Sequence, residues 1–226
     1  MTLIDLSHVI EAGMTTYPGI PGPIVCDYLT REESRSRYTD GTSFYIGKIE
    51  MVANTGTYVD APLHRYAGRA DVADLPLERL ADLQTVVVSI APAMRAIGPE
   101  AFLGTDLRGK ALLVHTGWSR HFRTPAYLQG HPYLTRAAAV ALVSAEVAFV
   151  GIDSLNIDDT SDGARPVHTL LLGSDIPIGE HFTNLGLLPK SGARLHAAPA
   201  RVRAMGSFPV RAYALVQEAE GAAKVR

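Results

Sequence analysis

Three side chains in residues 54–64 can bind a metal ion or move a proton. The segment reads NTGTYVDAPLH and contains Tyr58, Asp60 and His64. Carboxylates and imidazoles are ligands of Zn²⁺ and Mn²⁺, an imidazole also carries protons near neutral pH, and a phenol donates hydrogen bonds. The segment therefore predicts a site for catalysis or metal binding.

Glycine and proline restrict the backbone of the same segment. Gly56 and Pro62 disfavour a regular helix or strand across it. Residues 44–52, which precede it, are apolar and β-branched enough for a strand. The sequence predicts an irregular loop fed by that strand, and such loops commonly carry binding and catalytic residues.

The composition is that of a single enzyme-sized domain over residues 1–226. Hydrophobic residues make up 47% of the chain, enough for a substantial core. The 21 basic and 23 acidic residues give a formal net charge of -2 without a long run of either sign. Nucleic acid is not an expected partner, because phosphate binding needs a concentrated basic face.

Cysteine use and hydropathy predict a cytoplasmic protein. Cys26 is the single cysteine, so neither an intramolecular disulfide nor a thiolate cluster can form. The first residues have neither the basic nor the apolar region of a signal peptide. No apolar run reaches the roughly 18 to 20 residues that a membrane-spanning helix needs, so no membrane partner is expected.

Hydrophobic patterning alternates between strands and helices. Apolar, β-branched segments predict strands over residues 3–6, 44–52, 85–90, 111–115, 148–152 and 210–217. Helices are expected over residues 76–80, 99–103 and 135–144, with Thr135 as the cap of the last. Residues after Glu218 read as a frayed polar tail. The pattern predicts a mixed α/β domain.

The segment at residues 54–64 resembles the signature of the cyclase family that includes bacterial kynurenine formamidase and isatin hydrolase. That signature is His-x-Gly-Thr-His-x-Asp-x-Pro-x-His. This chain keeps five of its positions, namely Gly56, Thr57, Asp60, Pro62 and His64. It has Asn54 and Tyr58 where the family has its first two histidines. In the family, those two histidines and the aspartate bind one metal ion, so two ligands of that ion are replaced.

Four further parts of the chain are similar to the same family. They are residues 4–8 with 17–19 (IDLSH and YPG), 113–118 (LVHTGW), 151–158 (GIDSLNID), and the run from His168 to Leu185. The resemblance implies the family's swivelling β/β/α fold. It also implies assembly as a homodimer or homotetramer, with active sites near the subunit contacts.

The resemblance further implies one divalent ion, Zn²⁺ or Mn²⁺, bound by Asp60, His168 and Glu180. These residues match the family's second ion site, and one imidazole with two carboxylates suits either metal. The alternative is that no ion is retained. In that case Asp60 caps a turn, His168 is a loop histidine and Glu180 is a surface acid. His181, next to Glu180, is a further nitrogen donor, although adjacent strand side chains diverge.

The resemblance gives His64 the role of general acid and base, in place of a mere loop contact. Tyr58 has two interpretations: its phenol donates a hydrogen bond to a developing oxyanion, or it fills the volume of a lost metal site. For Asn54, filling is the favoured interpretation.

The resemblance, with the residues that depart from it, leaves three functions open. The leading one is a hydrolase that opens a small amide, lactam or lactone with metal-activated water and a histidine acid/base. The second is a metal-independent cyclase, dehydratase or isomerase of secondary metabolism. The third is a non-catalytic relative that binds a small molecule, or a partner, in the old cleft. The expected partner of the enzyme is a small-molecule substrate.

Overall fold

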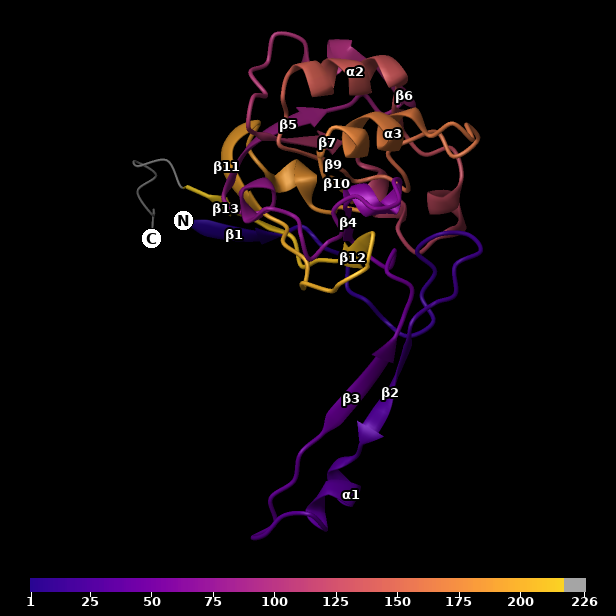
Figure 1. The fold of residues 1–226 in the computed structure, drawn as a ribbon, viewed down its shortest axis with the longest axis vertical. Helices are drawn as coiled ribbons and strands as arrows, with labels where there is room; N and C mark the ends of the chain where they lie inside the picture. The colour runs from indigo at the N-terminus through magenta and orange to yellow at the C-terminus, as the bar shows by residue number, and fades with distance from the viewer. Residues whose placement is uncertain (218–226) are drawn as a thin grey trace, which may run out of the picture.

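One curved sheet organises the computed structural model, which describes residues 1–217 (Figure 1). Within these residues it has nine strands. Their order across the sheet is β1 (Thr2–Asp5), β13 (Tyr213–Val216), β11 (Ser191–His196), β5 (Leu83–Ser89), β7 (Ala111–His115), β9 (Phe149–Ile152), β10 (Ile178–Glu180), β4 (Tyr58–Asp60) and β12 (Ser207–Pro209). Strands β5, β7, β9 and β10 are parallel, and the strands on either side of them pair antiparallel.

Both faces of the sheet are buried. Along β7, Leu112 and Val114 contribute to the core beneath helices α2 (Arg136–Ser144) and α3 (Pro166–Gly173). Leu113, which points the other way, contributes to a second core on the opposite face. Burial on both faces explains why the central strands read as continuous apolar runs.

Most of the expected core elements are confirmed. Strands β1, β5, β7, β9 and β13 lie at the expected segments, to within a few residues. The Thr135 side chain accepts a hydrogen bond from the backbone N–H of Ala138 and so caps α2, as expected. Residues 218–226, where the polar tail is expected, lie outside the described residues.

Two expected helices are wrong in type. Residues 76–80 and 99–103 contain only single 3₁₀ turns, at Leu77–Arg79 and Pro99–Phe102. Other 3₁₀ turns are Pro62–His64, Trp118–His121, Pro125–Leu128 and Leu185–Leu187, and a small separate sheet pairs β6 (Ala96–Ile97) with β8 (Tyr133–Leu134). These segments are too short for the cooperative hydrogen bonding that sustains an α-helix.

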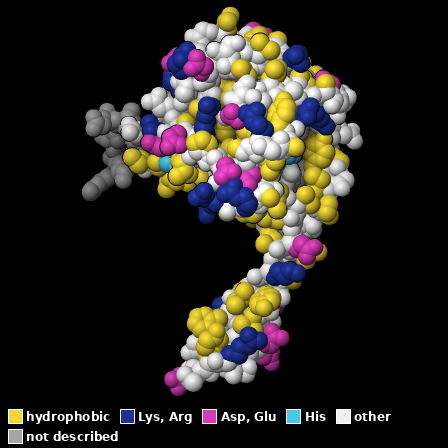
Figure 2. All heavy atoms as spheres, in the orientation of Figure 1, with side chains coloured by type: hydrophobic (Ala, Val, Ile, Leu, Met, Phe, Trp, Pro, Cys, Tyr) yellow, Lys and Arg dark blue, Asp and Glu magenta, His cyan; other side chains and the backbone are white. Residues whose placement is uncertain are grey.

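An arm formed by residues 24–50 projects from the body (Figure 1). It pairs β2 (Ile24–Leu29) with β3 (Ile46–Glu50) and carries the short helix α1 (Arg31–Arg35) near its tip. The strand expected over residues 44–52 is therefore present as β3, but it lies in the arm. Many apolar side chains of the arm are exposed (Figure 2), namely Ile24, Val25, Tyr28, Tyr38, Phe44, Tyr45, Ile46 and Ile49.

The expectation of an irregular loop through residues 54–64 is partly wrong. Strand β4 runs through it, because neither Gly56 nor Pro62 falls inside the three residues that pair. Gly56 takes a left-handed backbone (φ +66°) just before the strand, and Pro62 begins the 3₁₀ turn just after it.

Among residues 1–217, no helix has the length and apolar character that crossing a bilayer requires.

Candidate functional site

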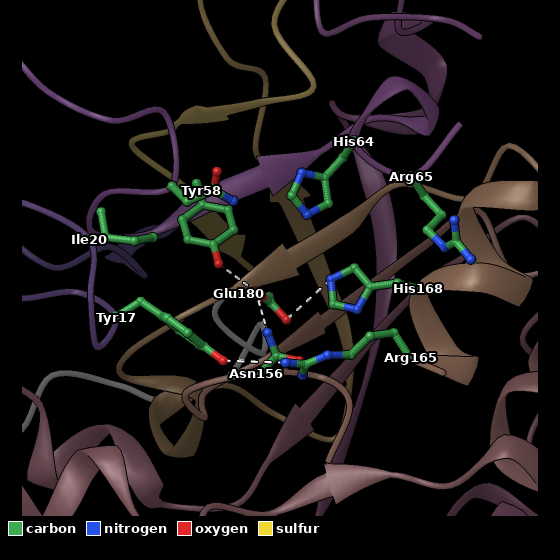
Figure 3. Close-up of a pocket in the computed structure, with 10 residues that line it drawn as sticks. Tyr17, Ile20, Tyr58, His64, Arg65, Asn156, Arg165, His168 and Glu180 are labelled. Carbon is green, nitrogen blue, oxygen red and sulfur yellow. Dashed lines mark hydrogen bonds and ion pairs between the residues drawn. The ribbon is translucent and has the colours of Figure 1, made fainter. Parts of the chain in front are cut away.

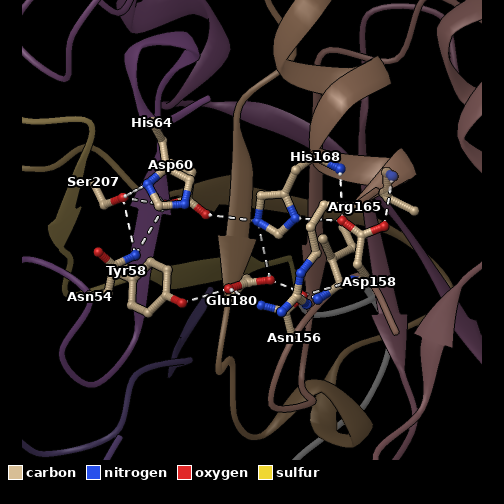
Figure 4. A network of polar contacts seen from close by, with 12 residues as sticks. Asn54, Tyr58, Asp60, His64, Asn156, Asp158, Arg165, His168, Glu180 and Ser207 are labelled. Carbon is tan, nitrogen blue, oxygen red and sulfur yellow. Dashed lines mark hydrogen bonds and ion pairs between the residues drawn. The ribbon is translucent and has the colours of Figure 1, made fainter. Parts of the chain in front are cut away.

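The register of three neighbouring strands gathers four polar side chains on one face of the sheet. Glu180 of β10 lies opposite Tyr58 of β4, and Ser207 of β12 lies opposite Asp60 of β4. Directly opposed residues point to the same face, as do residues two apart along a strand. Tyr58, Asp60, Glu180 and Ser207 therefore form one cluster (Figure 4).

Helix α3 adds His168 to this cluster. The Asp158 carboxylate accepts hydrogen bonds from the backbone N–H groups of Val167 (2.7 Å) and His168 (3.0 Å), in the first turn of the helix. It also contacts Nδ1 of the His168 ring at 2.7 Å. Asp158 thus holds the start of the helix and orients the imidazole, so that Nε2 faces the two carboxylates of the sheet.

The distances from the His168 ring to the two carboxylates are close to those between ligands of one divalent cation. Nε2 of His168 lies 3.6 Å from Oδ2 of Asp60 and 3.7 Å from Oε1 of Glu180. Ligand atoms about 2.0–2.2 Å from one tetrahedral ion lie roughly 3.3–3.6 Å apart. Oδ2 of Asp60 is buried and has no hydrogen-bond partner among the described residues. An unpartnered buried carboxylate oxygen facing an imidazole nitrogen is a position for a cation. The structure thus places both carboxylates that the sequence led us to expect as ligands within 3.7 Å of Nε2 of His168.

The electrostatics of the cluster also favour a bound cation. Burial opposes the charged imidazole, but the Asp158 hydrogen bond and the other carboxylates raise the pKa of His168 to about 10. Burial raises the pKa of Glu180 to about 7, although His168 acts in the opposite direction. Burial also acts to raise the pKa of Asp60, but His64, His168 and Ser207 bring it below its ordinary value. The cluster attracts a cation, and a metal must displace protons from it, so metal affinity rises with pH.

Tyr58 and Asn54 are hydrogen-bonded to the retained carboxylates. The Tyr58 hydroxyl donates to Oε2 of Glu180 at 2.5 Å, and burial with the nearby carboxylates raises the pKa of Tyr58 well above its ordinary value. Nδ2 of Asn54 donates to Oγ of Ser207 at 3.1 Å and to Oδ1 of Asp60 at 3.5 Å. Both residues therefore position the cluster, and the phenol proton points at Glu180.

His64 stands beside the cluster in the 3₁₀ turn after β4, with 37% of its side chain exposed. Oγ of Ser207 donates to Asp60 and lies 3.0 Å from Nδ1 of His64. Since the one hydroxyl hydrogen goes to Asp60, Ser207 accepts from Nδ1–H, which leaves Nε2 of the neutral ring free to take a proton. One ligand atom each from His64, Asp60 and His168 also lies within 4.8 Å of the others, so His64 is within reach of an ion too.

His181 follows Glu180, the last residue of β10. Its ring is fully buried, with Nδ1 2.8 Å from the Tyr127 hydroxyl and its centroid 5.2 Å from that of Tyr58. Burial lowers the pKa of His181 to about 3. Its ring contacts those of Tyr58, Phe122 and Tyr127.

An open cavity of about 290 Å³ leads to these residues (Figure 3). It is lined by Tyr17, Ile20, Asn54, Tyr58, His64, Arg65, Asn156, Arg165, His168 and Glu180. The sequence did not indicate a role for Asn156, Arg165 or Ser207. Asn156 lies in a segment similar to the family, but neither a motif nor a spacing connected Ser207 or Arg165 to the site.

Comparisons with known proteins agree on one family. The sequence profile described as "Putative cyclase" matches residues 4–159. Kynurenine formamidase of Geobacillus thermodenitrificans (strain NG80-2) is 28% identical over 211 residues, which cover 92% of this chain and 95% of that protein. Kynurenine formamidase of Salinibacter ruber is 27% identical over 215 residues, which cover 94% of this chain and 96% of that protein.

Solved structures agree on the fold. Isatin hydrolase A from Labrenzia aggregata, bound to benzyl benzoate, superposes with a TM-score of 0.83 at 22% identity, over 96% of this chain and 94% of that one. A potential metal-dependent hydrolase with cyclase activity gives 0.79 at 24% identity, over 96% and 98%. These likenesses confirm the fold that the sequence resemblance implied. The profile match extends over more than half of the sequence, and the chain therefore belongs to the cyclase family.

Proposed function

We propose that this protein is a metal-dependent hydrolase that opens the C–N bond of a small amide or lactam, or the ester bond of a lactone. The observation that carries the proposal is that Nε2 of His168 lies 3.6 Å from Oδ2 of Asp60 and 3.7 Å from Oε1 of Glu180. All three residues are buried, and His168 and Glu180 line an open cavity. The formamidase relatives, named for hydrolysis of an amide, support the reaction class.

Asp60, His168 and Glu180 would hold one divalent ion, Zn²⁺ or Mn²⁺. When bound, the ion supplies Lewis acidity that activates water and polarises the substrate carbonyl. Asp158 keeps the nitrogen of His168 aimed at the ion position, and Tyr58 keeps Oε2 of Glu180 hydrogen-bonded. Such supporting contacts orient ligands and raise their basicity.

His64 carries the proton in this proposal. Its free Nε2 takes a proton from water as the water oxygen attacks the carbonyl carbon, and returns it to the nitrogen or oxygen that leaves. Ser207 and Asp60 hold Nδ1 of the ring in place. Because the Tyr58 hydroxyl donates to Glu180, the geometry favours this reaction over one in which Tyr58 alone polarises the carbonyl.

We also propose that the protein is a homodimer or homotetramer assembled through the arm. A two-stranded hairpin is marginally stable alone in water. The exposed apolar residues of the arm, such as Tyr28, Phe44 and Ile49, form a surface that a second copy can bury.

We place the protein in the cytoplasm. Cys26 is an exposed free thiol, and a reducing compartment keeps such a thiol unpaired.

The proposal is tested with metal-free protein reloaded with Zn²⁺ or Mn²⁺ and assayed on formanilide and on small lactams and lactones. Reloading should restore hydrolysis. His64→Gln should lower kcat by about 10²- to 10⁴-fold while leaving metal affinity within about twofold. His121→Gln, which changes a histidine outside the cavity, should match the wild type. Failure of the reloaded wild type to hydrolyse any member of the panel would count against the function, and a large loss of metal affinity in His64→Gln would make His64 a ligand instead.

A further inference from the structure

Arg65 and Arg165 both line the cavity, and neither has an acidic partner among the described residues; Arg165 is the one that contacts Asn156 and Tyr17 in its wall. Arg165 precedes α3, and its guanidinium lies 3.3 Å from Oδ1 of Asn156 and 3.4 Å from the hydroxyl of Tyr17 (Figure 3). It forms no ion pair with a carboxylate of residues 1–217. A guanidinium has five N–H donors, and the two long contacts use only part of this capacity. Arg165 can therefore still bind an anion.

The backbone of Arg165 is in a conformation that a residue with a side chain rarely adopts. Its φ of 45° and ψ of 59° are left-handed, and Pro166 follows it. The carbonyl of Arg165 accepts from the N–H of Thr169 at 3.0 Å, and its own N–H donates to Asp162 at 3.3 Å, so the turn is held at both ends. Glycine would adopt this turn at lower cost. An arginine held here indicates that the side chain is used.

Arg165 also lies next to the metal ligands. Nδ2 of Asn156 donates to Oε2 of Glu180 at 3.5 Å, while Oδ1 of the same amide accepts from Arg165. Only one side chain thus separates the guanidinium from a proposed ligand of the ion. The charges of Asp60 and Glu180 would be balanced by the cation between them and by His168. The charge of Arg165 has no such balance within the cavity.

We infer that Arg165, together with the Tyr17 hydroxyl, binds a carboxylate group of the substrate. A planar guanidinium matches a carboxylate with two parallel hydrogen bonds. The substrates are then small acids whose carboxylate lies a few atoms from the amide or ester bond that is opened. The identity of the bond that is opened rests on the proposed function. The preference for a substrate with a carboxylate does not.

The binding step is tested without turnover. Benzoate and benzamide, which have the same ring and differ in charge, are titrated into metal-free wild type, Arg165→Gln, Arg165→Gly and Arg136→Gln. The wild type should bind benzoate at least about 10-fold more tightly than benzamide. Both Arg165 variants should reduce this preference to within about twofold. Arg136→Gln, at an exposed arginine in the first turn of α2, should retain it.

Folding and function are separated by two further readouts. Arg165→Gly relieves the left-handed backbone, so its Tm should equal or exceed that of the wild type while the benzoate preference is lost. With reloaded enzyme, Arg165→Gln should raise KM for 3-formamidobenzoate at least about 10-fold more than KM for formanilide. Equal binding of benzoate and benzamide by the wild type, or an unchanged preference in Arg165→Gln, would overturn the inference. A benzoate preference that depends on Arg165, in a protein without hydrolase activity, would refute the proposed function alone.

Discussion

Asn54 and Tyr58 are the two residues at which this chain departs from the family signature, and each has a defined partner. Tyr58 donates to Glu180, and Asn54 donates to Ser207 and Asp60. The Tyr58 hydroxyl and the Asn54 amide hydrogen-bond the neighbouring carboxylates. They can therefore replace the two histidines of the signature without leaving those carboxylates unsatisfied. The same contacts keep the remaining ligands in position for one ion.

Metal stoichiometry tests this replacement. The wild type should bind one Zn²⁺ per chain, and Asn54→His with Tyr58→His should bind two, because two imidazoles are restored beside Asp60. Native mass spectrometry after dialysis against Zn²⁺ counts the ions. Tyr58→Phe is the control: it should keep one ion with lower affinity, because loss of the hydrogen bond further raises the pKa of Glu180. Two ions in the wild type, or one in the double variant, would contradict the replacement.

At the scale of elements, strand pairing explains what the sequence could predict and what it could not. Asp60 and His64 stand in one dense motif, so their types and spacing indicate chemistry directly. Ser207 contacts His64 across 143 positions of sequence, through the pairing of β12 with β4. Gly206 permits that approach, since a Cβ there would lie 2.7 Å from Cα of His64. No local pattern encodes such a contact.

The core strands were predictable for a related reason. Leu112, Leu113 and Val114 are buried on opposite faces of β7, so apolar content alone marks the strand. Helix α3 was missed, because it is short and begins after a left-handed residue, Arg165, in place of a usual capping residue. The strand over residues 44–52 was expected, but its place in an arm was not, because its exposed apolar residues follow a pattern like that of a buried strand.

The contact between Asp158 and α3 gives a prediction at this scale. In Asp158→Asn, Nδ1–H of His168 loses its carboxylate, so affinity for Zn²⁺ should fall by about 10- to 100-fold. Competition with a chelator measures the affinity. Asp175→Asn is a matched control, since Asp175 is an exposed carboxylate just after the other end of α3. Equal affinities in Asp158→Asn and the wild type would show that Asp158 does not orient the ligand.

The same variant has a pH signature in metal-free protein. Because the pKa of His168 is raised from 6.5 to about 10, its stabilising contribution is complete below about pH 6.5 and is lost as pH rises through about 10. Asp158→Asn removes a main cause of the raised pKa. The free energy of unfolding should therefore fall by about 1–3 kcal/mol at pH 7, and its further decline up to about pH 9.5 should be shallower than in the wild type. Urea unfolding at the two pH values measures both effects.

At the scale of the whole molecule, the arm and the cavity share their connecting segments. Tyr17 and Ile20 line the cavity just before β2 begins, and Asn54 lines it just after β3 ends. Whatever fixes the direction of the arm therefore also fixes one wall of the cavity. Assembly through the arm, as proposed, would connect the oligomeric state to substrate binding.

Val25 and Ile49 offer a way to test this assembly without unfolding the arm. They are about half exposed and lie directly opposite each other on β2 and β3. Val25→Lys with Ile49→Glu replaces the apolar pair by opposite charges, which still favour pairing of the two strands. The same charges are costly to bury against a second copy.

Light scattering after size-exclusion chromatography should find the wild type at two or four times the mass of one chain, and the double variant at the mass of one chain. Leu103→Lys, at an apolar residue of the body that is 84% exposed, should leave the mass of the wild type unchanged. The double variant should also bind benzoate more weakly, because Tyr17 and Ile20 lose the support of a fixed arm. A wild type that stays monomeric at about 100 μM, where even weak specific interfaces are populated, would refute assembly through the arm.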